Sequence, residues 1–212
     1  MTAWLIQIIP DERRREVRHA LADAEQLHKT LMLLVPDGLG PDARAVAGLL
    51  YRIDRGRAGT RLLVQSRLEP DTHRLPAGYA RADVRKLTPL LERLTAGTVV
   101  HYRLAANTTK RGGRGAGEKA GKIIPLRGAD ADGWWADRAA HRGLALRSLV
   151  ASPLDDATGA RAGRRVRHAL TRFDGLAVVT DSDAVRQAVL DGVGRAKTYG
   201  AGLLSLAIQA SR

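Results

Sequence analysis

The stretch GVGRAKTYGAGLLSLA, residues 192–207, follows a predicted helix and leads into the last predicted strand of the chain. Asp181 or Ser182 supplies an N-cap for that helix, and the first glycine of the stretch ends it. The apolar run Leu203–Ile208 predicts the final strand, and Leu176–Thr180 predicts another strand before the helix. The end of the chain therefore combines strands with a helix.

Four glycines of this stretch surround Lys197, at positions 192, 194, 200 and 202. Such a pattern can bring backbone N–H groups and an ammonium group close to a phosphate. Its spacing does not match a P-loop, and no βαβ unit follows it as in a dinucleotide-binding fold. A helix stop with a tight turn explains the same glycines equally well, so the spacing leaves both interpretations open.

The segments before it predict a long hairpin and a short helix. Leu144–Ser152 and Arg164–Phe173 are strand-like, and the turn Asp155–Gly159 lies between them. Asp132–Arg142 predicts a helix that carries two tryptophans. Before that helix, TTKRGGRGAGEKAGK (residues 108–122) is glycine-rich and basic, which predicts a mobile loop between two halves of the chain.

The first half predicts elements of the same kinds. Ala3–Ile9 predicts a buried strand, and Asp23 with Gln26 predicts a capping box for a helix from Ala24 to Val35. Arg13–Leu21 is also compatible with a helix, which is either separate or the start of one longer or bent helix. The other predicted strands are Leu49–Asp54, Arg61–Ser66 and Val99–Ala106, and residues 67–98 show little pattern.

Each half thus mixes about four strands with helices in a βαββ-like order. That order predicts an α+β protein of two tandem ferredoxin-like units, residues 1–107 and 108–212. No internal sequence repeat accompanies the pattern, so the prediction depends on element order alone.

The charge of the chain indicates a polyanionic partner. Its 35 Lys and Arg exceed its 22 Asp and Glu, which gives a formal net charge of +13. Between Asn107 and Arg172 there are 14 basic and 6 acidic residues, so a third of the chain carries most of the excess. Nucleic acid is the commonest partner for such a protein, although a solvated arginine-rich surface is the simpler alternative.

The scarcity of aromatic residues favours a helical RNA over an unpaired strand. The chain has 3 Trp, 4 Tyr and 1 Phe, and no predicted strand carries the paired aromatics that stack unpaired bases. Double-stranded RNA, which proteins grip by its shape and phosphates, is therefore the expected ligand.

The start of the chain, MTAWLIQIIPDERRR, has an apolar run of only about eight residues that precedes the charges. That order and length do not fit a signal peptide, and no later stretch approaches a membrane span. The chain has no cysteine, which excludes a disulfide scaffold, a thiolate metal site and a cysteine nucleophile. We expect a cytoplasmic protein without membrane contact.

Histidines are the candidates for acid–base chemistry, because a histidine can exchange a proton with a ribose 2′-hydroxyl near neutral pH. Cleavage by that hydroxyl needs no metal, and the chain has no HExxH motif or acidic cluster for a metal site. His28 lies on the apolar stripe of its predicted helix, where a histidine is more often a core residue than a catalyst. His101 and His141 are weaker candidates, and His19, His73 and His168 are predicted on the surface.

Several stretches together resemble the CasE family of CRISPR RNA-processing endoribonucleases from type I-E systems. They are EQLHKTLMLL (25–34), EPDTHRLPAGYA (69–80), HYRLAANTTK (101–110), GKIIPL with the Trp134–Trp135 helix, and above all GVGRAKTYGAGLLSLA (192–207). The similarity runs in consistent order over essentially the whole chain.

This resemblance implies two ferredoxin-like folds of the repeat-associated RNA-binding type. It also implies an antiviral-defence enzyme without a cofactor that recognises the stem-loop of a CRISPR repeat transcript. Such enzymes cut at the 3′ base of the hairpin and leave a 2′,3′-cyclic phosphate and a 5′-hydroxyl. They usually stay on the mature crRNA as a subunit of the Cascade complex.

Carried over residue by residue, the family's catalytic histidine falls on His28. Family members commonly have tyrosine three residues earlier, where this chain has Glu25, so that tyrosine's role does not transfer. The family's basic stem-gripping hairpin corresponds to Arg161, Arg164, Arg165 and Arg167. The other candidate RNA contacts are Lys29, Lys110, Arg111, Gly194, Lys197 and Gly200, and the three lysines are also candidates to stabilise the phosphorane.

Two other functions fit parts of the sequence. In a non-catalytic RNA-binding subunit of a ribonucleoprotein, His28 would only pack against its neighbours. A nucleotide-binding enzyme would use the glycine-rich stretch, but it requires a phosphate-site context that this sequence lacks.

Overall fold

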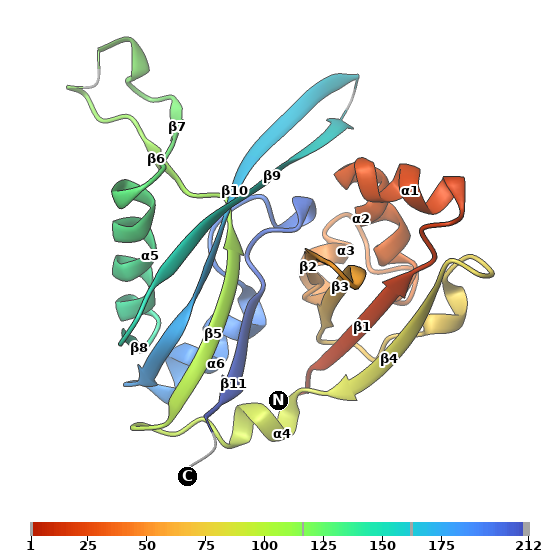
Figure 1. The fold of residues 1–212 in the computed structure, drawn as a ribbon, viewed down its shortest axis with the longest axis horizontal. Helices are drawn as coiled ribbons and strands as arrows, with labels where there is room; N and C mark the ends of the chain where they lie inside the picture. Colours follow the sequence, from red (N-terminus) through yellow and green to blue (C-terminus); the bar gives the residue numbers. More distant parts are fainter. Residues whose placement is uncertain (1, 116, 162, 210–212) are drawn as a thin grey trace.

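The protein folds into two antiparallel β-sheets that lie side by side, each covered by helices (Figure 1). The computed structural model describes residues 2–115, 117–161 and 163–209, and the side chain of Arg161 lies outside this description. Within these residues, none of the helices has the length and apolar character needed to span a membrane.

The first sheet has the strand order β2-β3-β1-β4, with every neighbouring pair antiparallel. Its strands are β1 (Trp4–Pro10), β2 (Leu50–Gly56), β3 (Gly59–Ser66) and β4 (Ala80–Lys86). The helices before β2 are α1 (Arg15–Ala22), α2 (Ala24–Met32) and α3 (Ala43–Ala47), and the short η1 (Thr72–Arg74) precedes β4. Because β3 lies between β1 and β2, this order is that of a ferredoxin-like unit.

The second sheet has the order β11-β5-β10-β8, and β9 also pairs with β10. Its strands are β5 (Val99–Ala106), β8 (Leu144–Leu146), β9 (Val150–Arg161), β10 (Arg164–Val179) and β11 (Leu204–Ile208). Helix α5 (Ala129–His141) follows β5, and α6 (Ser182–Asp191) with η3 (Lys197–Tyr199) connects β10 to β11. This is again the ferredoxin-like order, so the predicted fold class is confirmed.

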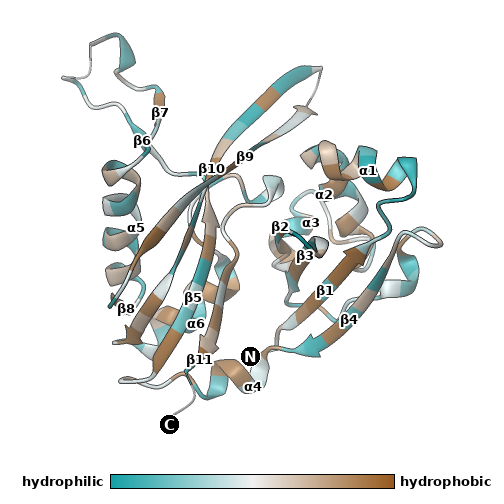
Figure 2. Ribbon diagram, in the orientation of Figure 1, coloured by the Kyte–Doolittle hydropathy of each residue, from teal (hydrophilic) through white to brown (hydrophobic). Residues whose placement is uncertain are grey.

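Each of the two units has its own buried apolar core. The first contains Ile6 and Ile8 of β1 with Leu27 and Leu31 of α2. The second surrounds the rings of Trp135 and Phe173, whose centroids lie 6.2 Å apart. In Figure 2 strand β1 is largely brown and β5 alternates between brown and teal, whereas the outer part of β10 is mostly teal. The outer part of β10 therefore belongs to a polar surface.

The boundary predicted at residues 107 and 108 is wrong. Strand β5 pairs with β10 and β11, so it is the first strand of the second unit although it precedes the predicted boundary. The units instead meet around α4 (Thr88–Glu92), after β4. The glycine-rich segment that marked the boundary lies inside the second unit.

That segment is also more ordered than a plain loop. Strands β6 (Thr109–Arg111) and β7 (Ile123–Pro125) pair with each other, and η2 (Gly117–Lys119) lies between them. Residues 109–115 and 117–125 therefore form a two-stranded projection, called the β6–β7 arm below, which rises above α5 in Figure 1.

Other elements of the first unit differ from their predicted bounds. The two predicted helices are separate, because Asp23 is extended (φ −122°, ψ 110°) between α1 and α2. Helix α2 ends at Met32 rather than Val35, where the N–H groups of residues 33–35 bond three residues back. Strand β4 was not predicted: it is a charged and mostly exposed edge strand, which lacks an alternating apolar pattern.

The long hairpin of β9 and β10 extends beyond its sheet. Strand β10 pairs with β5 only from Thr171 to Val178, so its outer half pairs with β9 alone. The register shifts between His168 and Leu170, where the amide of Asn107 donates to the carbonyl of Ala169 at 2.8 Å. A shift of this kind bends a strand, and the hairpin projects above the sheet in Figure 1.

Buried polar contacts connect the two units. The hydroxyl of Tyr51 on β2 donates to the carbonyl of Thr198 at 3.1 Å and lies 3.4 Å from that of Ala24. Gln65 on β3, which is 1% exposed, donates to the carbonyl of Val189 at 2.8 Å. Such contacts fix the α6–β11 loop (residues 192–203) against the first sheet.

Gly200 in this loop has a left-handed backbone (φ +78°), and a Cβ there would lie 3.1 Å from the ring of Tyr51. We expect Gly200→Val to lower the free energy of unfolding by about 2 to 5 kcal/mol, because it adds both backbone strain and overpacking. Gly113→Val is the matched control, since its φ is not positive and nothing lies within 4 Å of its Cβ position. Equal melting temperatures for the two variants would contradict this.

Candidate active site and nucleic-acid interface

His28 lies in the middle of α2, whose start is fixed by a strong cap. The carboxylate of Asp23 accepts hydrogen bonds from the N–H groups of Glu25 at 2.8 Å and Gln26 at 3.0 Å, as predicted. Leu27 and Leu31 are fully buried, whereas His28 is half-buried and belongs to neither apolar cluster. A rigid helix therefore presents His28 at the edge of the core.

The first turn of α2 contacts two elements of the second unit. The hydroxyl of Tyr199 in η3 donates to Oε2 of Glu25 at 3.3 Å. Gly159 of β9 packs against the same turn, and a Cβ there would lie 3.1 Å from the nitrogen of Glu25. The ring of Tyr199 also contacts that of His168 on β10, with centroids 4.7 Å apart. The helix of His28 therefore meets both the long hairpin and the glycine-rich loop.

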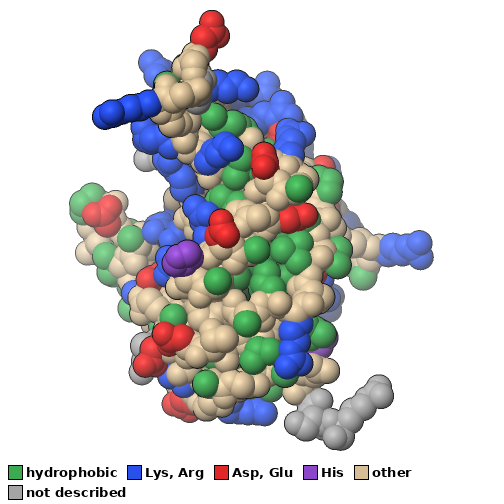
Figure 3. Space-filling model, turned by 90° about the vertical axis from the view of Figure 1, so that its left-hand side faces the viewer, with side chains coloured by type: hydrophobic (Ala, Val, Ile, Leu, Met, Phe, Trp, Pro, Cys, Tyr) green, Lys and Arg blue, Asp and Glu red, His purple; other side chains and the backbone are tan. Residues whose placement is uncertain are grey.

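A groove with a volume of about 750 Å³ opens beside this junction and is bordered by His168 and Tyr199. Two neighbouring hollows share lining residues with it, one through Arg195 and the other through Arg167. The cations of this continuous surface, called the basic groove, are Arg44, Lys110, Arg111, Arg127, Arg138, Arg165, Arg167, Arg195 and Lys197. Figure 3 shows Lys and Arg gathered in the upper half of one face, where the β6–β7 arm rises.

Positive charge is concentrated where the glycine-rich loop enters the groove. Burial lowers the pKa of Lys197, and the nearby guanidinium of Arg44 lowers it further. Its ammonium donates to the main-chain carbonyl of Asp191 at 2.7 Å. The preceding Ala196 has φ +56°, a left-handed conformation that costs a non-glycine residue about 1 kcal/mol. A strained residue among clustered cations indicates a site for an anion.

Six of the predicted site residues line the basic groove: Lys110, Arg111, Arg165, Arg167, Gly194 and Lys197. Lys29 is exposed beside His28, and Lys110 and Arg111 lie on the β6–β7 arm. Arg164 and Arg165 are exposed on the outer half of β10. Arg167 follows them there and forms an ion pair with Asp156 of β9. The side chain of Arg161, the remaining predicted arginine of the hairpin, lies outside the described residues.

The glycines of the loop pack closely against other parts of the protein. Gly200 is buried against Tyr51, and its contact with an RNA stays a prediction, as does that of Gly194, which lines the basic groove. Gly194 is half-buried, and a Cβ there would lie 3.2 Å from the ring of Trp134. The loop therefore needs glycines chiefly to pack against the protein itself.

Sequence reasoning missed Arg44, Arg127 and Arg195 in the basic groove, and it misplaced His168. Predicted on the surface, His168 is half-buried, and burial followed by the charge of Arg195 lowers its pKa. No local pattern marks these residues, because they come from four separate segments. The sequence offered one signal that His168 lies at a functional surface, namely its position between Arg167 and Arg172 on a predicted strand.

The other histidines lie away from this junction. His101 is exposed on β5, and His141 at the end of α5 is 2.6 Å from the carbonyl of Asp137. In the part of the chain that the structure describes, no group of three or more His, Asp or Glu side chains has an arrangement suited to a metal ion.

Two ferredoxin-like units with a shared basic groove and a histidine beside it define a protein of the RNA-binding and RNA-processing class. The family described as CRISPR associated protein matches residues 3–207. The chain belongs to this family.

Individual relatives are similar over nearly their whole lengths. The CRISPR-associated endoribonuclease Cse3 of Thermus thermophilus is 29% identical over 219 residues, which cover 96% of this chain and 99% of Cse3. A structure of that Cse3, bound to an RNA that represents a pre-cleavage complex, has a TM-score of 0.81 at 29% identity and covers 98% of this chain and 100% of its own. A chain of a CRISPR RNA-guided surveillance complex in a pre-nicking state is 43% identical, with a TM-score of 0.73 and coverage of 97% and 100%.

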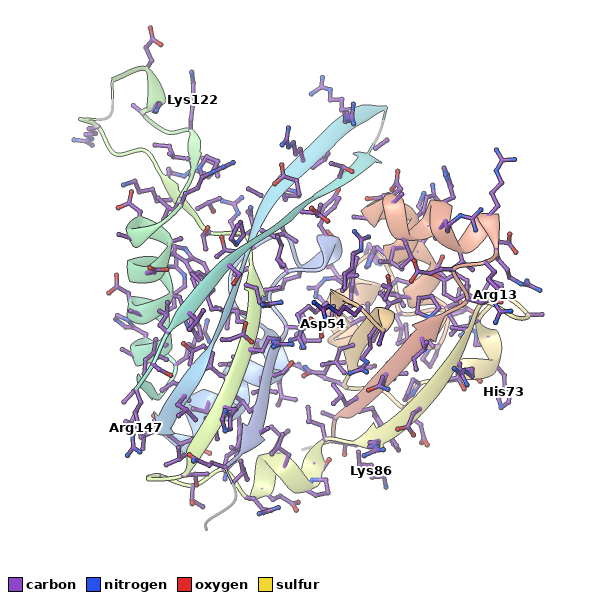
Figure 4. The ribbon with its side chains drawn as sticks, viewed as in Figure 1. Arg13, Asp54, His73, Lys86, Lys122 and Arg147 are labelled. Atoms are coloured by element: carbon purple, nitrogen blue, oxygen red, sulfur yellow. The ribbon has the colours of Figure 1, made fainter. Side chains whose placement is uncertain are left out.

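The environment of His168 makes a prediction for its titration. Because the guanidinium of Arg195 disfavours protonation of the ring, Arg195→Ala should raise the pKa of His168. Arg147→Ala, which removes an exposed cation at the opposite end of the second sheet in Figure 4, should leave the pKa of His168 unchanged. Titration of the histidine ring signals by proton NMR measures this pKa in both variants. A lower pKa of His168 in Arg195→Ala would refute the proposed effect of Arg195.

Proposed function

We propose that this chain is a metal-independent endoribonuclease that binds the stem-loop of a CRISPR repeat transcript in the basic groove. It cuts the pre-crRNA at the 3′ base of the stem, with His28 as the catalytic residue. It then stays on the crRNA as a subunit of the Cascade surveillance complex in the cytoplasm. The relatives named above, an endoribonuclease and a complex subunit, support both steps.

The observation that carries the proposal is the contact between the helix of His28 and an element that lines the basic groove. Helix α2 contacts η3, and η3 with Arg195 and Arg167 lines the groove. A phosphate held by these cations is presented to the helix that carries His28. An RNA stem bound along the hairpin would enter the groove from the exposed end of β10, where Arg164 and Arg165 lie.

The chemistry requires one mobile proton and a stabilised phosphorane. The ribose 2′-hydroxyl attacks the adjacent phosphorus, which yields a 2′,3′-cyclic phosphate and releases the 5′-oxygen as a hydroxyl. His28 exchanges the proton in this transfer, since histidine is the side chain that titrates near neutral pH. Lys29, Lys110 and Lys197 are the candidates to stabilise the negative charge on the phosphorane.

The first test of this function replaces the catalytic group. His28→Ala should slow cleavage of a CRISPR repeat hairpin about a hundred-fold or more in the presence of EDTA, because proton transfer is lost. Its dissociation constant should stay within about twofold of the parent, because the phosphate contacts remain. Single-turnover cleavage and filter binding measure the two quantities.

The control for this test is His73→Ala, an exposed histidine that Figure 4 places at the far edge of the first unit. It should cleave at the parental rate. If the parent binds the hairpin but does not cut it in EDTA, the chain is a non-catalytic RNA-binding subunit. If His28→Ala cuts within threefold of the parent, His28 is not the catalytic residue.

A second test concerns the hairpin arginines. Arg165 is exposed, lines the groove, and forms no ion pair within the described residues, so Arg165→Ala should remove one phosphate contact. The slope of log affinity against log salt concentration should then fall by about one unit. Arg147→Ala, at the opposite end of the second sheet, should keep the parental slope. Equal slopes in the two variants would show that Arg165 does not face the RNA.

A further inference from the structure

The first turn of α2, one turn before His28, contacts one tyrosine of the second unit and one of its own unit. Tyr199 donates to the carboxylate of Glu25 at 3.3 Å. The carbonyl of Ala24 lies 3.4 Å from the hydroxyl of Tyr51, which also donates to Thr198. Residues at i and i+3 share one face of a helix, so Glu25 and His28 project from the same side of α2. Whatever fixes Glu25 therefore orients the face that presents His28.

Tyr199 connects that face to the strand that carries the hairpin arginines. Its ring is 6% exposed and contacts the ring of His168, which follows Arg167 on β10. Gly159 of the paired strand β9 packs directly against Glu25. Strand β9 therefore contacts the first turn of α2 directly, and β10 contacts it through Tyr199. The hairpin, Tyr199 and the start of α2 form one contiguous set of contacts.

We propose that Tyr199 and Glu25 are positioning residues, which hold His28 in register with an RNA bound along β10. This rests on the function proposed above. The hydroxyl of Tyr199 fixes the carboxylate of Glu25, and its ring fixes the distance to β10 through His168. Neither residue needs to touch the reacting atoms. A small misplacement of a catalytic group lowers the rate of chemistry much more than the affinity, because binding depends on many other contacts.

The central test removes a single oxygen atom. Tyr199→Phe should lower the single-turnover cleavage rate at saturating protein about tenfold, while the dissociation constant for a hairpin with a 2′-deoxy cleavage nucleotide stays within twofold. Tyr102→Phe is the matched control, because Tyr102 is a 3% exposed residue whose hydroxyl likewise donates one hydrogen bond, to the carbonyl of Ser148 at 2.9 Å inside the second unit. Tyr102→Phe should cleave at the parental rate even if its melting temperature falls as far as that of Tyr199→Phe.

Variants of the acceptor separate the hydrogen bond from the charge. Glu25→Gln keeps an oxygen that can accept from Tyr199, so it should cleave within about threefold of the parent. Glu25→Leu should match Tyr199→Phe, and the double variant Glu25→Leu with Tyr199→Phe should be no slower than either, because both remove one contact. The proposal would be overturned if the double variant lost cleavage rate by the product of the two single losses. It would also be overturned if Glu25→Gln were as slow as Glu25→Leu.

The outcomes also distinguish this inference from the function on which it rests. If the parent fails to cleave in EDTA, the proposed function fails. If His28→Ala stops cleavage but Tyr199→Phe cleaves at the parental rate, the function stands and the positioning role is refuted. A Tyr199→Phe variant that loses affinity in parallel with rate would show a structural role in RNA binding, which also overturns the proposal.

Discussion

The rest of the molecule depends on the buried hydroxyl of Tyr51. This fully buried side chain of β2 reaches two main-chain carbonyls, those of Ala24 in α2 and Thr198 in η3. Burial and the nearby Tyr199, Glu25 and Asp23 raise the pKa of its phenol, so it remains a donor. A single donor thus ties together the helix of His28 and the glycine-rich loop, which come from different units.

This connection explains why the site lies between the units rather than inside one. Ferredoxin-like units pack their helices on one face of a sheet, so neither unit alone surrounds a histidine on α2 with cations from a hairpin. The α6–β11 loop crosses to the first sheet, and its glycines permit the close approach, as at Gly200 against Tyr51. Arg44 of the first unit and Lys197 of the second then border one groove.

The sequence predicted the elements that local physics determines. The cap at Asp23 and the strand Val99–Ala106 are confirmed, because capping and apolar alternation depend on neighbouring residues. Strand β4 was missed, since its stability comes from pairing with β1 and not from its own charged residues. The contact of Tyr199 with Glu25 joins residues 174 positions apart, so no spacing rule could reveal it.

The net charge of +13 indicates a binding surface only when it is known which arginines form ion pairs. In the cleft between the units, Arg52 is paired with Asp54, and both Arg103 and Arg172 are paired with Asp174. Figure 4 shows Asp54 between the two units, and it lines a hollow there with Arg52 and Arg172.

In the basic groove Arg167 is paired with Asp156, but Arg127, Arg165 and Arg195 form no ion pairs with described residues. Paired charges create little field at a distance, whereas unpaired ones in a groove attract a polyanion. Both surfaces are rich in arginine, so arginine content alone does not distinguish them. The distribution of carboxylates does, and it favours the basic groove as the surface for the RNA in the proposed function.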